Sequence, residues 1–159
     1  IVQEAGKGLI IALNKWDLIT NKDSNTINKY TKEIRRDAPF LDYAPLIFIS
    51  AIEKQRIFKV FELVSEIYEQ ATKKIATNLL TRIVLEAFAL NPPTSEKGKR
   101  LKAYYSTQLG TQPPTFIIFI NNIDLVKENY LRYLDKKLRE AFGFFGTPIK
   151  IIMRPRKEK

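Results

Sequence analysis

Asn14, Lys15 and Asp17 form an Asn-Lys-x-Asp string directly after the apolar run at residues 9–13. A carboxylate at Asp17 can accept two parallel hydrogen bonds, and guanine offers a matching donor pair in its N1–H and exocyclic amine. Adenine has no such pair on that edge. Asn14 would tie the loop to its neighbours and approach the O6/N7 edge of the base. Lys15 would lay its methylene stem across the purine face while its ammonium stays hydrated. The spacing therefore predicts a guanine-reading loop.

Two apolar runs are expected to position this loop as buried strands. Residues 9–13 precede Asn14, and residues 46–49 lead directly into Ser50 and Ala51. Runs of Val, Ile and Leu type are typical of parallel strands buried on both faces. A string at the end of such a strand resembles the guanine-reading element of P-loop GTPases, which place a Ser-Ala after the next strand. The resemblance implies that the backbone N–H of Ala51 donates to guanine O6.

The string also has a simpler interpretation. Asn-Lys-x-Asp occurs by chance in unrelated chains, and Asn and Asp after a strand are ordinary turn formers. The second strand with its Ser-Ala pair favours base recognition. A run ending in Asn121-Asn122-Ile123-Asp124 looks similar but lacks a Lys to cover the base and a following Ser-Ala. We therefore predict that Asp124 is the N-cap of a helix over residues 126–142.

Composition excludes several kinds of site. The chain has 159 residues, 45% of them hydrophobic and 11% aromatic, which suits one ordinary domain or two small ones with real cores. It has no Cys or His, which excludes disulfides, thiolate or imidazole metal ligands and a histidine base. No apolar run approaches a membrane span, so we expect a cytoplasmic protein without membrane association. Residue 1 is Ile rather than Met, and we expect the numbering to start inside a longer protein.

Positive charge is concentrated in the second half of the chain. The net charge is +10; residues 1–75 hold 12 Lys/Arg and 10 Asp/Glu, a net of +2, whereas residues 76–159 hold 15 and 7, a net of +8. Such an imbalance favours a polyanionic partner, of which nucleic acid is the usual one. The alternative is a basic surface that only keeps the protein soluble.

Hydrophobic periodicity divides the chain into two patterns. The first is β-α-β-α, with strands at 9–13 and 46–49, a helix ending near residue 37 and an amphipathic helix over 56–72. The inner stripe predicted for that last helix is Ile57, Val60, Phe61, Val64, Ile67 and Tyr68. The second is α-β-β-α-β: a helix from Thr77, a hairpin over 99–107 and 115–121, the helix over 126–142, and a strand at 149–153. This order on a three-stranded sheet resembles a KH-type RNA-binding domain.

Longer motifs carry a more specific resemblance. Three further strings accompany the Asn-Lys-Trp-Asp string and the Ser-Ala pair. They are Asn91-Pro92-Pro93, GTQPPTF at 110–116 and REAFGFFGTP at 139–148. Together they are similar to the carboxyl-terminal part of the Der (EngA) family of bacterial GTPases. The implied fold is α/β: a partial doubly wound P-loop GTPase domain at 1–74, followed by an α+β KH-like domain with a three-stranded sheet and helices at 75–159.

The family resemblance also implies ligands and partners. It implies a GTP-binding protein that binds GTP and GDP with Mg²⁺ and acts in assembly of the large ribosomal subunit, with that subunit or its rRNA as partner. Other partners would be the missing amino-terminal GTPase domains of the same protein. The implied guanine-site residues are Asn14, Lys15, Asp17, Ser50 and Ala51.

The phosphate-binding half of a GTPase is absent from the sequence. There is no GxxxxGK[ST] loop, no magnesium-contacting Thr and no DxxG segment; Gly6-Lys7-Gly8 is the nearest string. Phosphoryl transfer depends almost wholly on positioning and charge around the phosphates. We therefore expect no catalytic residue and no metal ligand in this chain, which would not hydrolyse GTP alone.

The KH-like part departs from the usual pattern. KH domains grip RNA with a GxxG loop between two helices, whereas residues 143–146 lie between a helix and a strand, where a C-cap and turn compete with a phosphate clamp. Strand alternation would place Arg100, Lys102 and Tyr104 on one face if Leu101, Ala103 and Tyr105 face the helices. An ordinary solvated face is the alternative. The candidate RNA contacts are Lys97, Lys99, Arg100, Lys102, Tyr104, Arg154, Arg156 and Lys157.

A rival hypothesis belongs to another functional class. The KH-like domain would dock on neighbouring GTPase domains and report their nucleotide state, with little RNA binding of its own. Salt dependence separates the two hypotheses, because neutralising several phosphates gives a steep slope and protein docking does not.

Overall fold

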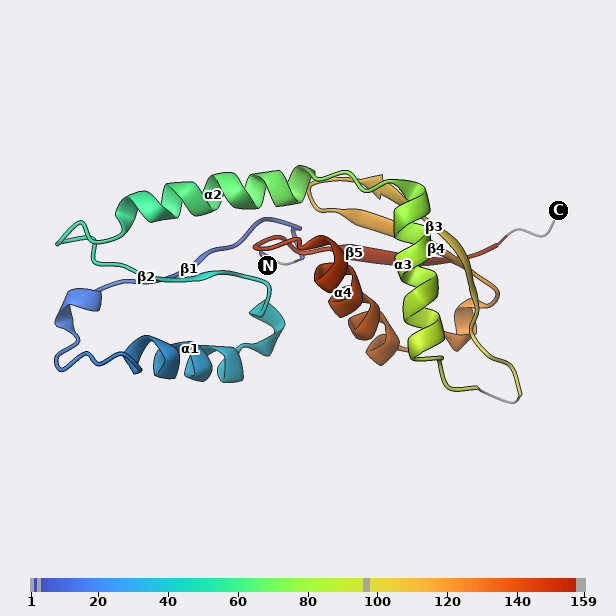
Figure 1. Ribbon diagram of the computed structural model, residues 1–159, viewed down its shortest axis with the longest axis horizontal. Helices are drawn as coiled ribbons and strands as arrows, with labels where there is room; N and C mark the ends of the chain where they lie inside the picture. Colours follow the sequence, from blue (N-terminus) through green and yellow to red (C-terminus); the bar gives the residue numbers. More distant parts are fainter. Residues whose placement is uncertain (1, 3, 96–97, 157–159) are drawn as a thin grey trace. The chain divides into compact units, whose positions relative to one another are not determined.

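The computed structural model describes residues 2, 4–95 and 98–156 (Figure 1). It comprises two units, each with its own core. The first unit extends to Gln70 and also contains Phe145–Pro148. The second contains Ala71–Phe144 and the chain from Ile149 onward. Within the described ranges, no helix combines the length and the apolar character needed to cross a bilayer.

The first unit is built on two short parallel strands. β1 (Ile11–Leu13) pairs with β2 (Leu46–Phe48), so that Ile11 lies opposite Leu46 and Leu13 opposite Phe48. The 3-10 helix η1 (Trp16–Leu18), helix α1 (Thr26–Asp37) and the 3-10 helix η2 (Pro39–Leu41) connect them. Helix α2 (Ile57–Thr72) follows β2. The order is the predicted β-α-β-α.

Side-chain hydrogen bonds fix both ends of α1. Oδ1 of Asp23 accepts from the backbone N–H of Asn25 and from the Thr26 hydroxyl, and these bonds hold the pKa of the Asp23 carboxyl below its usual range. At the other end, the guanidinium of Arg35 donates to the carbonyls of Leu41 and Ala44 at 2.6 and 2.5 Å. The chain is thereby turned from α1 toward β2.

Helix α2 buries only part of the predicted stripe: Ile67 is buried and Ile57 and Val60 are half-buried. Leu63 and Ile67 are buried, whereas Phe61, Val64 and Tyr68 are 65%, 52% and 61% exposed. The prediction that these three residues face inward is therefore wrong for this chain. The described sheet of this unit has two strands, and much of the apolar surface of the helix stays exposed.

Gly146 lies in the segment Phe145–Pro148, which belongs to the first unit although it is distant in the sequence, and its position requires glycine. Its N–H donates to the carbonyl of Tyr43, and its carbonyl accepts from the N–H of Leu9, both at 2.8 Å. Its φ is +68°, and a Cβ there would collide with the side chain of Ile67. Only glycine combines this left-handed backbone with so close an approach.

The second unit has the predicted α-β-β-α-β order and an α+β fold. Its helices are α3 (Thr77–Leu90) and α4 (Glu128–Phe142), and its strands are β3 (Ala103–Gly110), β4 (Thr115–Ile120) and β5 (Lys150–Pro155). In the sheet order β3-β4-β5, the first pair is antiparallel and the second parallel.

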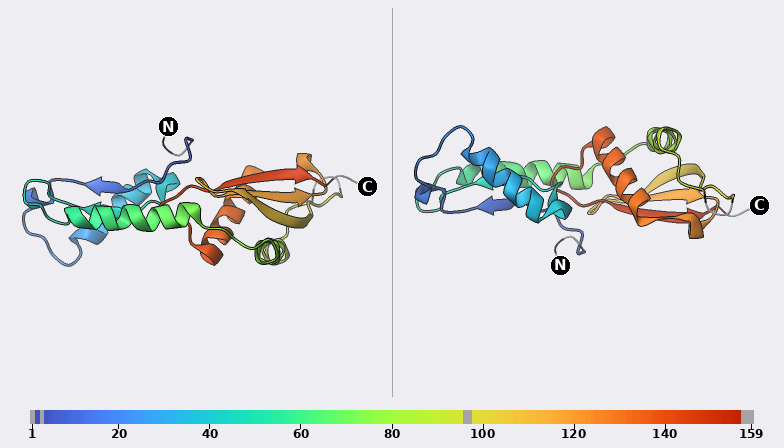
Figure 2. Two further views of the ribbon diagram at one scale, coloured as in Figure 1. Left: turned by 90° about the horizontal axis from the view of Figure 1, so that it is seen from above. Right: turned by 90° about the horizontal axis from the view of Figure 1, so that it is seen from below.

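Both helices of the second unit lie on one side of the three-stranded sheet (Figure 2). Alternate residues of β4, namely Phe116, Ile118 and Ile120, point into the core beneath them and are fully buried. The tyrosines of α4 tie the helices together, because the hydroxyl of Tyr130 donates to the carbonyl of Asn91 at 3.0 Å and that of Tyr133 to Ala87 at 2.9 Å. The opposite face of the sheet carries no helix of this unit.

The prediction that Asp124 caps α4 is wrong. Asp124 lies in the 3-10 helix η3 (Ile123–Leu125), and its N–H donates to the side chain of Asn122. Leu125 and Val126 pack into the core, and the extended backbone of Val126 delays the helix. The helix therefore begins at Glu128, with Lys127 as its N-cap.

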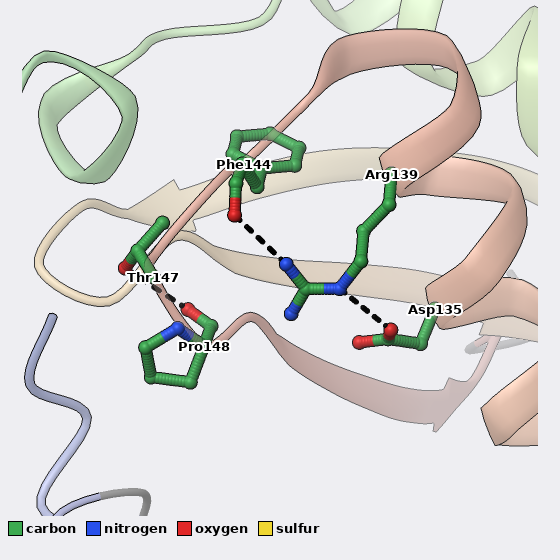
Figure 3. A network of polar contacts seen from close by, with 5 residues as sticks. All are labelled: Asp135, Arg139, Phe144, Thr147 and Pro148. Atoms are coloured by element: carbon green, nitrogen blue, oxygen red, sulfur yellow. Dashed lines mark hydrogen bonds and ion pairs between the residues drawn. The ribbon is translucent and has the colours of Figure 1, made fainter. Parts of the chain in front are cut away.

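The end of α4 is a C-cap and turn, as one of the two interpretations of residues 143–146 predicted. Gly143 has a φ of 91°, and its N–H donates to the carbonyl of Arg139. The guanidinium of Arg139 donates to Asp135 and to the carbonyl of Phe144, both at 2.8 Å (Figure 3). Phe144 itself is fully buried. Because the N–H groups of Gly143 and Gly146 already have protein acceptors, this loop does not fit a phosphate clamp.

Candidate functional site

The carboxyl ends of β1 and β2 bring the predicted guanine-site residues together. The hydroxyl of Ser50 donates to Oδ1 of Asp17 at 2.5 Å, and the backbone N–H of Ala51 donates to Oδ1 of Asn14 at 3.1 Å. Each bond joins the loop after one strand to the loop after the other. The two loops are thereby held in register at one edge of the sheet, where ligands bind in open α/β sheets.

Ser50 is the most constrained residue of the site. It is fully buried, and its backbone exchanges hydrogen bonds with Gln55 at 3.2 and 2.9 Å. Its hydroxyl oxygen also accepts from the N–H of Glu53 at 3.1 Å. A hydroxyl fixed on both sides has one direction left for its proton, which is toward Asp17. Ser50 therefore sets the orientation of that carboxylate.

Asp17 retains the acceptor capacity that base recognition requires. No described residue donates to its Oδ2, and Oδ1 keeps a second lone pair beside the bond from Ser50. The neighbouring Trp16 is buried, with its ring centroid 4.5 Å from that of Phe48 and 5.8 Å from that of Tyr30. This packing anchors the loop from below and leaves Asp17 partly exposed at its top.

Lys15 has an unusual backbone conformation. Its φ of 64° is left-handed, and its N–H donates to Oδ1 of Asn14 at 2.8 Å. Asn14 Oδ1 thus accepts from both Lys15 and Ala51. The backbone N–H of Ala51, which was expected to donate to guanine O6, therefore donates to Asn14 in this structure. A bound guanine would have to share this donor with Asn14 or displace Asn14 from it. The Lys15 side chain is exposed, as covering a base requires.

The candidate RNA residues fall into three groups. Lys97 and Lys157 lie outside the described residues. Lys99, Arg100 and Lys102 are exposed on the segment before β3. The side chain of Asn121 holds this segment, donating to the carbonyl of Arg100 and accepting from the N–H of Lys102, both at 2.9 Å. The third group contains Tyr104 and Arg154, on the sheet itself, and Arg156, directly after β5.

The prediction that Tyr105 faces the helices is wrong. A β-bulge between Ala103 and Tyr105 places Tyr105 opposite Phe119, and their rings stack with centroids 4.2 Å apart. Phe119 alternates with the core residues of β4, so both rings lie on the face without helices. Tyr104 contacts the guanidinium of Arg156, which lies 5.1 Å from its ring centroid. Because of this bulge, the side chains of β3 do not alternate strictly between the two faces of the sheet.

Comparison with known proteins identifies the family. Residues 74–154, just over half of the chain, match the family model described as "KH-domain-like of EngA bacterial GTPase enzymes, C-terminal". The chain belongs to this EngA family. The resemblance found in the sequence motifs is therefore confirmed.

Curated relatives of this EngA-family chain carry the name GTPase Der. It is 49% identical to the protein of Geobacillus sp. (strain WCH70) over 154 residues, 97% of this chain and 35% of the relative. It is 49% identical to that of Agathobacter rectalis over 158 residues, 99% of this chain and 36% of the relative. The relative from Streptococcus uberis is 49% identical over 97% of the chain. The chain thus spans about a third of the length of these relatives.

Sequence reasoning missed two contributors to these sites in the EngA-family chain. Gln55 fixes Ser50 from a position five residues away, and nothing in its type suggested this bridge. Tyr105 and Phe119 were missed because their proximity depends on the bulge. The sequence does contain a hint of the bulge, namely the adjacent pair Tyr104 and Tyr105, because strict alternation would place these two rings on opposite faces of the sheet.

Proposed function

We propose that this chain is the guanine-recognition part of a GTPase domain (residues 1–74) joined to a KH-like RNA-binding domain (residues 75–159), in a GTP-binding protein that acts in assembly of the large ribosomal subunit. The observation that carries the proposal is the pair of hydrogen bonds from Ser50 to Asp17 and from Ala51 to Asn14. They orient a carboxylate and an amide at the edge where a base would bind. The GTPase name of the relatives supports the same activity for the longer protein.

Base recognition follows from the donors and acceptors of the loop. Asp17 would accept from the N1–H and the exocyclic amine of guanine, while Ser50 keeps its carboxylate in place. Lys15 would cover one face of the purine. A site that reads paired donors rejects a base that lacks them, because its buried polar groups would be left unpaired.

The residues present fit the base but not the rest of the nucleotide. The described part of the chain contains no group of three or more acidic side chains that could hold a metal ion. The residues do not fit Mg²⁺, and we assign no step to it here. GTP or GDP binding with Mg²⁺, and hydrolysis, are proposed for the longer protein.

The exposed apolar stripe of α2 supports a GTPase domain that extends beyond this chain. Phe61, Val64 and Tyr68 are more than half exposed on this helix, and the described sheet of the same unit has two strands. A parallel sheet is normally covered on both faces and has more strands than two. Further strands beside β1 would give this stripe a surface to pack on.

A titration of the chain with nucleosides tests whether the loop that carries Asn14 and Asp17 recognises guanine. Guanosine should shift the backbone amide resonances of Lys15 and Ala51 in a ¹H–¹⁵N NMR spectrum, and adenosine at the same concentration should not. Equal shifts with both nucleosides, or none with guanosine, would remove the loop from base recognition.

Salt dependence tests the proposed partner. Affinity for an rRNA fragment should fall steeply as salt rises, since the basic domain would release counterions from several phosphates. A flat dependence would favour the rival hypothesis of a docking module for neighbouring GTPase domains.

A further inference from the structure

The helix-free face of the β3-β4-β5 sheet has an unusual composition. A sheet with one solvated face normally carries polar side chains there. Here the outward positions include Tyr105, Phe119 and Ile117, and Ile117 is buried although no helix of this unit lies on this face. An exposed aromatic patch of this kind marks a surface that binds something.

The β-bulge places two aromatic rings side by side on this face. Ala103 and Ser106 both face the core, and the residues between them, Tyr104 and Tyr105, are 40% and 42% exposed. Tyr105 stacks on Phe119 with an interplanar angle of 16°. Because β3 is an edge strand, the stack ends at the sheet edge on Tyr105, whose outer ring surface is available.

Cations border the rings. Arg154 lies directly across from Phe119 in the β4–β5 register, and the guanidinium of Arg156 sits over the ring of Tyr104. The three strands contain no Asp or Glu, and their charged residues are Lys150 and Arg154. The face is therefore aromatic and purely basic, which complements the flat bases and phosphates of a nucleic acid strand.

We propose that Tyr104, Tyr105, Phe119, Arg154 and Arg156, here called the aromatic face, bind unpaired bases of single-stranded RNA. A base would continue the Tyr105–Phe119 stack, and the two arginines would contact the phosphates on either side. Stacking on aromatic side chains is the general means of holding unpaired bases without sequence choice. This inference rests on the RNA-binding part of the proposed function and assigns it to a surface other than a GxxG loop.

Binding of labelled decauridine to the intact 159-residue chain, followed by fluorescence anisotropy, tests the proposal. The double variant Tyr105→Leu/Phe119→Leu keeps the apolar surface but removes both rings, and its affinity should fall about tenfold or more. The single variant Tyr104→Leu should lose about threefold to tenfold; because Tyr104 is exposed beside Arg156, this variant is testable even if the double variant does not fold. The matched control is Tyr68→Leu, an exposed tyrosine on α2, which should bind as the native chain does.

Each outcome separates this inference from the proposed function. Weaker binding by folded aromatic variants, with a ten-base-pair RNA duplex bound more weakly than decauridine, supports the aromatic face. Native affinity in folded variants overturns it while leaving RNA binding to the basic segment at 99–102, and the face would then suit a protein partner. Equal affinity for duplex and single strand also overturns it. No binding of any RNA at low salt would overturn both this inference and the RNA-binding part of the proposed function.

Discussion

The hydroxyl of Ser50 donates to Oδ1 of Asp17 across the carboxyl ends of two parallel strands. The bond aligns the carboxylate before any ligand arrives, because the serine is itself fixed by Gln55 and Glu53. A preoriented acceptor pair loses less conformational entropy on binding than a freely rotating carboxylate. In the proposed guanine site, selectivity would therefore depend on a residue that need not touch the base.

Ser50→Ala should weaken guanosine binding about tenfold, since the carboxylate of Asp17 loses its orienting donor. It should also lower the free energy of unfolding by about 1–3 kcal/mol, because the N–H of Glu53 loses its acceptor. The nucleoside titration and urea unfolding measure the two effects. Ser65→Ala is the control: Ser65 is exposed on α2, bonded to the carbonyl of Phe61, and its loss should alter neither quantity. Native guanosine affinity in Ser50→Ala would show that Asp17 is oriented by other means.

The isolated chain should bind GTP and GDP with at most millimolar affinity and show no turnover. Base contacts without phosphate contacts omit the strongest electrostatic attraction between a nucleotide and a GTPase. Calorimetry with both nucleotides, together with a phosphate-release assay, measures this. Micromolar binding by the chain alone would mean that it contains a phosphate site that its sequence motifs do not reveal.

Local sequence patterns predicted most elements, and the errors share a cause. The two strands before Asn14 and Ser50 and the α-β-β-α-β order follow from apolar runs and turn residues that act locally. The bulge that turns Tyr105 outward depends on cross-strand register, and the exposure of Phe61 on α2 depends on how many strands lie beneath it. Neither quantity is encoded in a short window of sequence.

The same limit applies to the sites. The Asn-Lys-x-Asp string made Asp17 a candidate because its chemistry lies in four adjacent residues. Asn14 was expected to tie the loop to its neighbours, but its partner, the N–H of Ala51, was not predicted, because the bond forms between two loops that are distant in the sequence. Asp124 precedes α4 but does not cap it, because Leu125 and Val126 are needed in the core and the helix begins later.

Replacing Lys99, Arg100 and Lys102 with Glu should reduce RNA affinity and flatten its salt dependence. The three side chains are exposed on one short segment, so the change reverses local charge without altering the apolar core. The melting temperature should stay within a few degrees of the native value. As a charge-matched control, Lys22, Lys29 and Lys32 in and before α1 can be replaced with Glu and should leave the RNA affinity much less affected. Equal losses in both variants would mean that net charge alone attracts the RNA.

Tyr130→Phe should reduce the sensitivity of the second unit to alkaline pH. Burial raises the pKa of the Tyr130 hydroxyl above the usual value of 10.0 for a tyrosine, so the folded state favours the neutral phenol. The resulting stabilisation is complete below pH 10 and is lost as pH rises from 10 toward the raised folded-state pKa. Urea unfolding at pH 8 and pH 11 should show a smaller loss for Tyr130→Phe than for the native chain. At pH 8 the variant should be about 1 kcal/mol less stable, because the bond to Asn91 is gone. If both proteins lost the same free energy of unfolding between pH 8 and pH 11, the stabilising role assigned to the neutral Tyr130 hydroxyl would be contradicted.

Asp17→Asn, made in the longer protein that includes the phosphate-binding part, tests the central claim most directly. An amide replaces one acceptor with a donor, which opposes the exocyclic amine of guanine and suits the carbonyl that xanthine has at the same position. Affinities for GTP and XTP should be measured for the native protein and for the variant. We predict that GTP affinity falls by at least a hundredfold, on the order of the penalty for a mismatched polar pair, and that XTP affinity rises. Unchanged GTP affinity in the variant, or loss of GTP with no gain of XTP, would contradict the paired-acceptor role of Asp17.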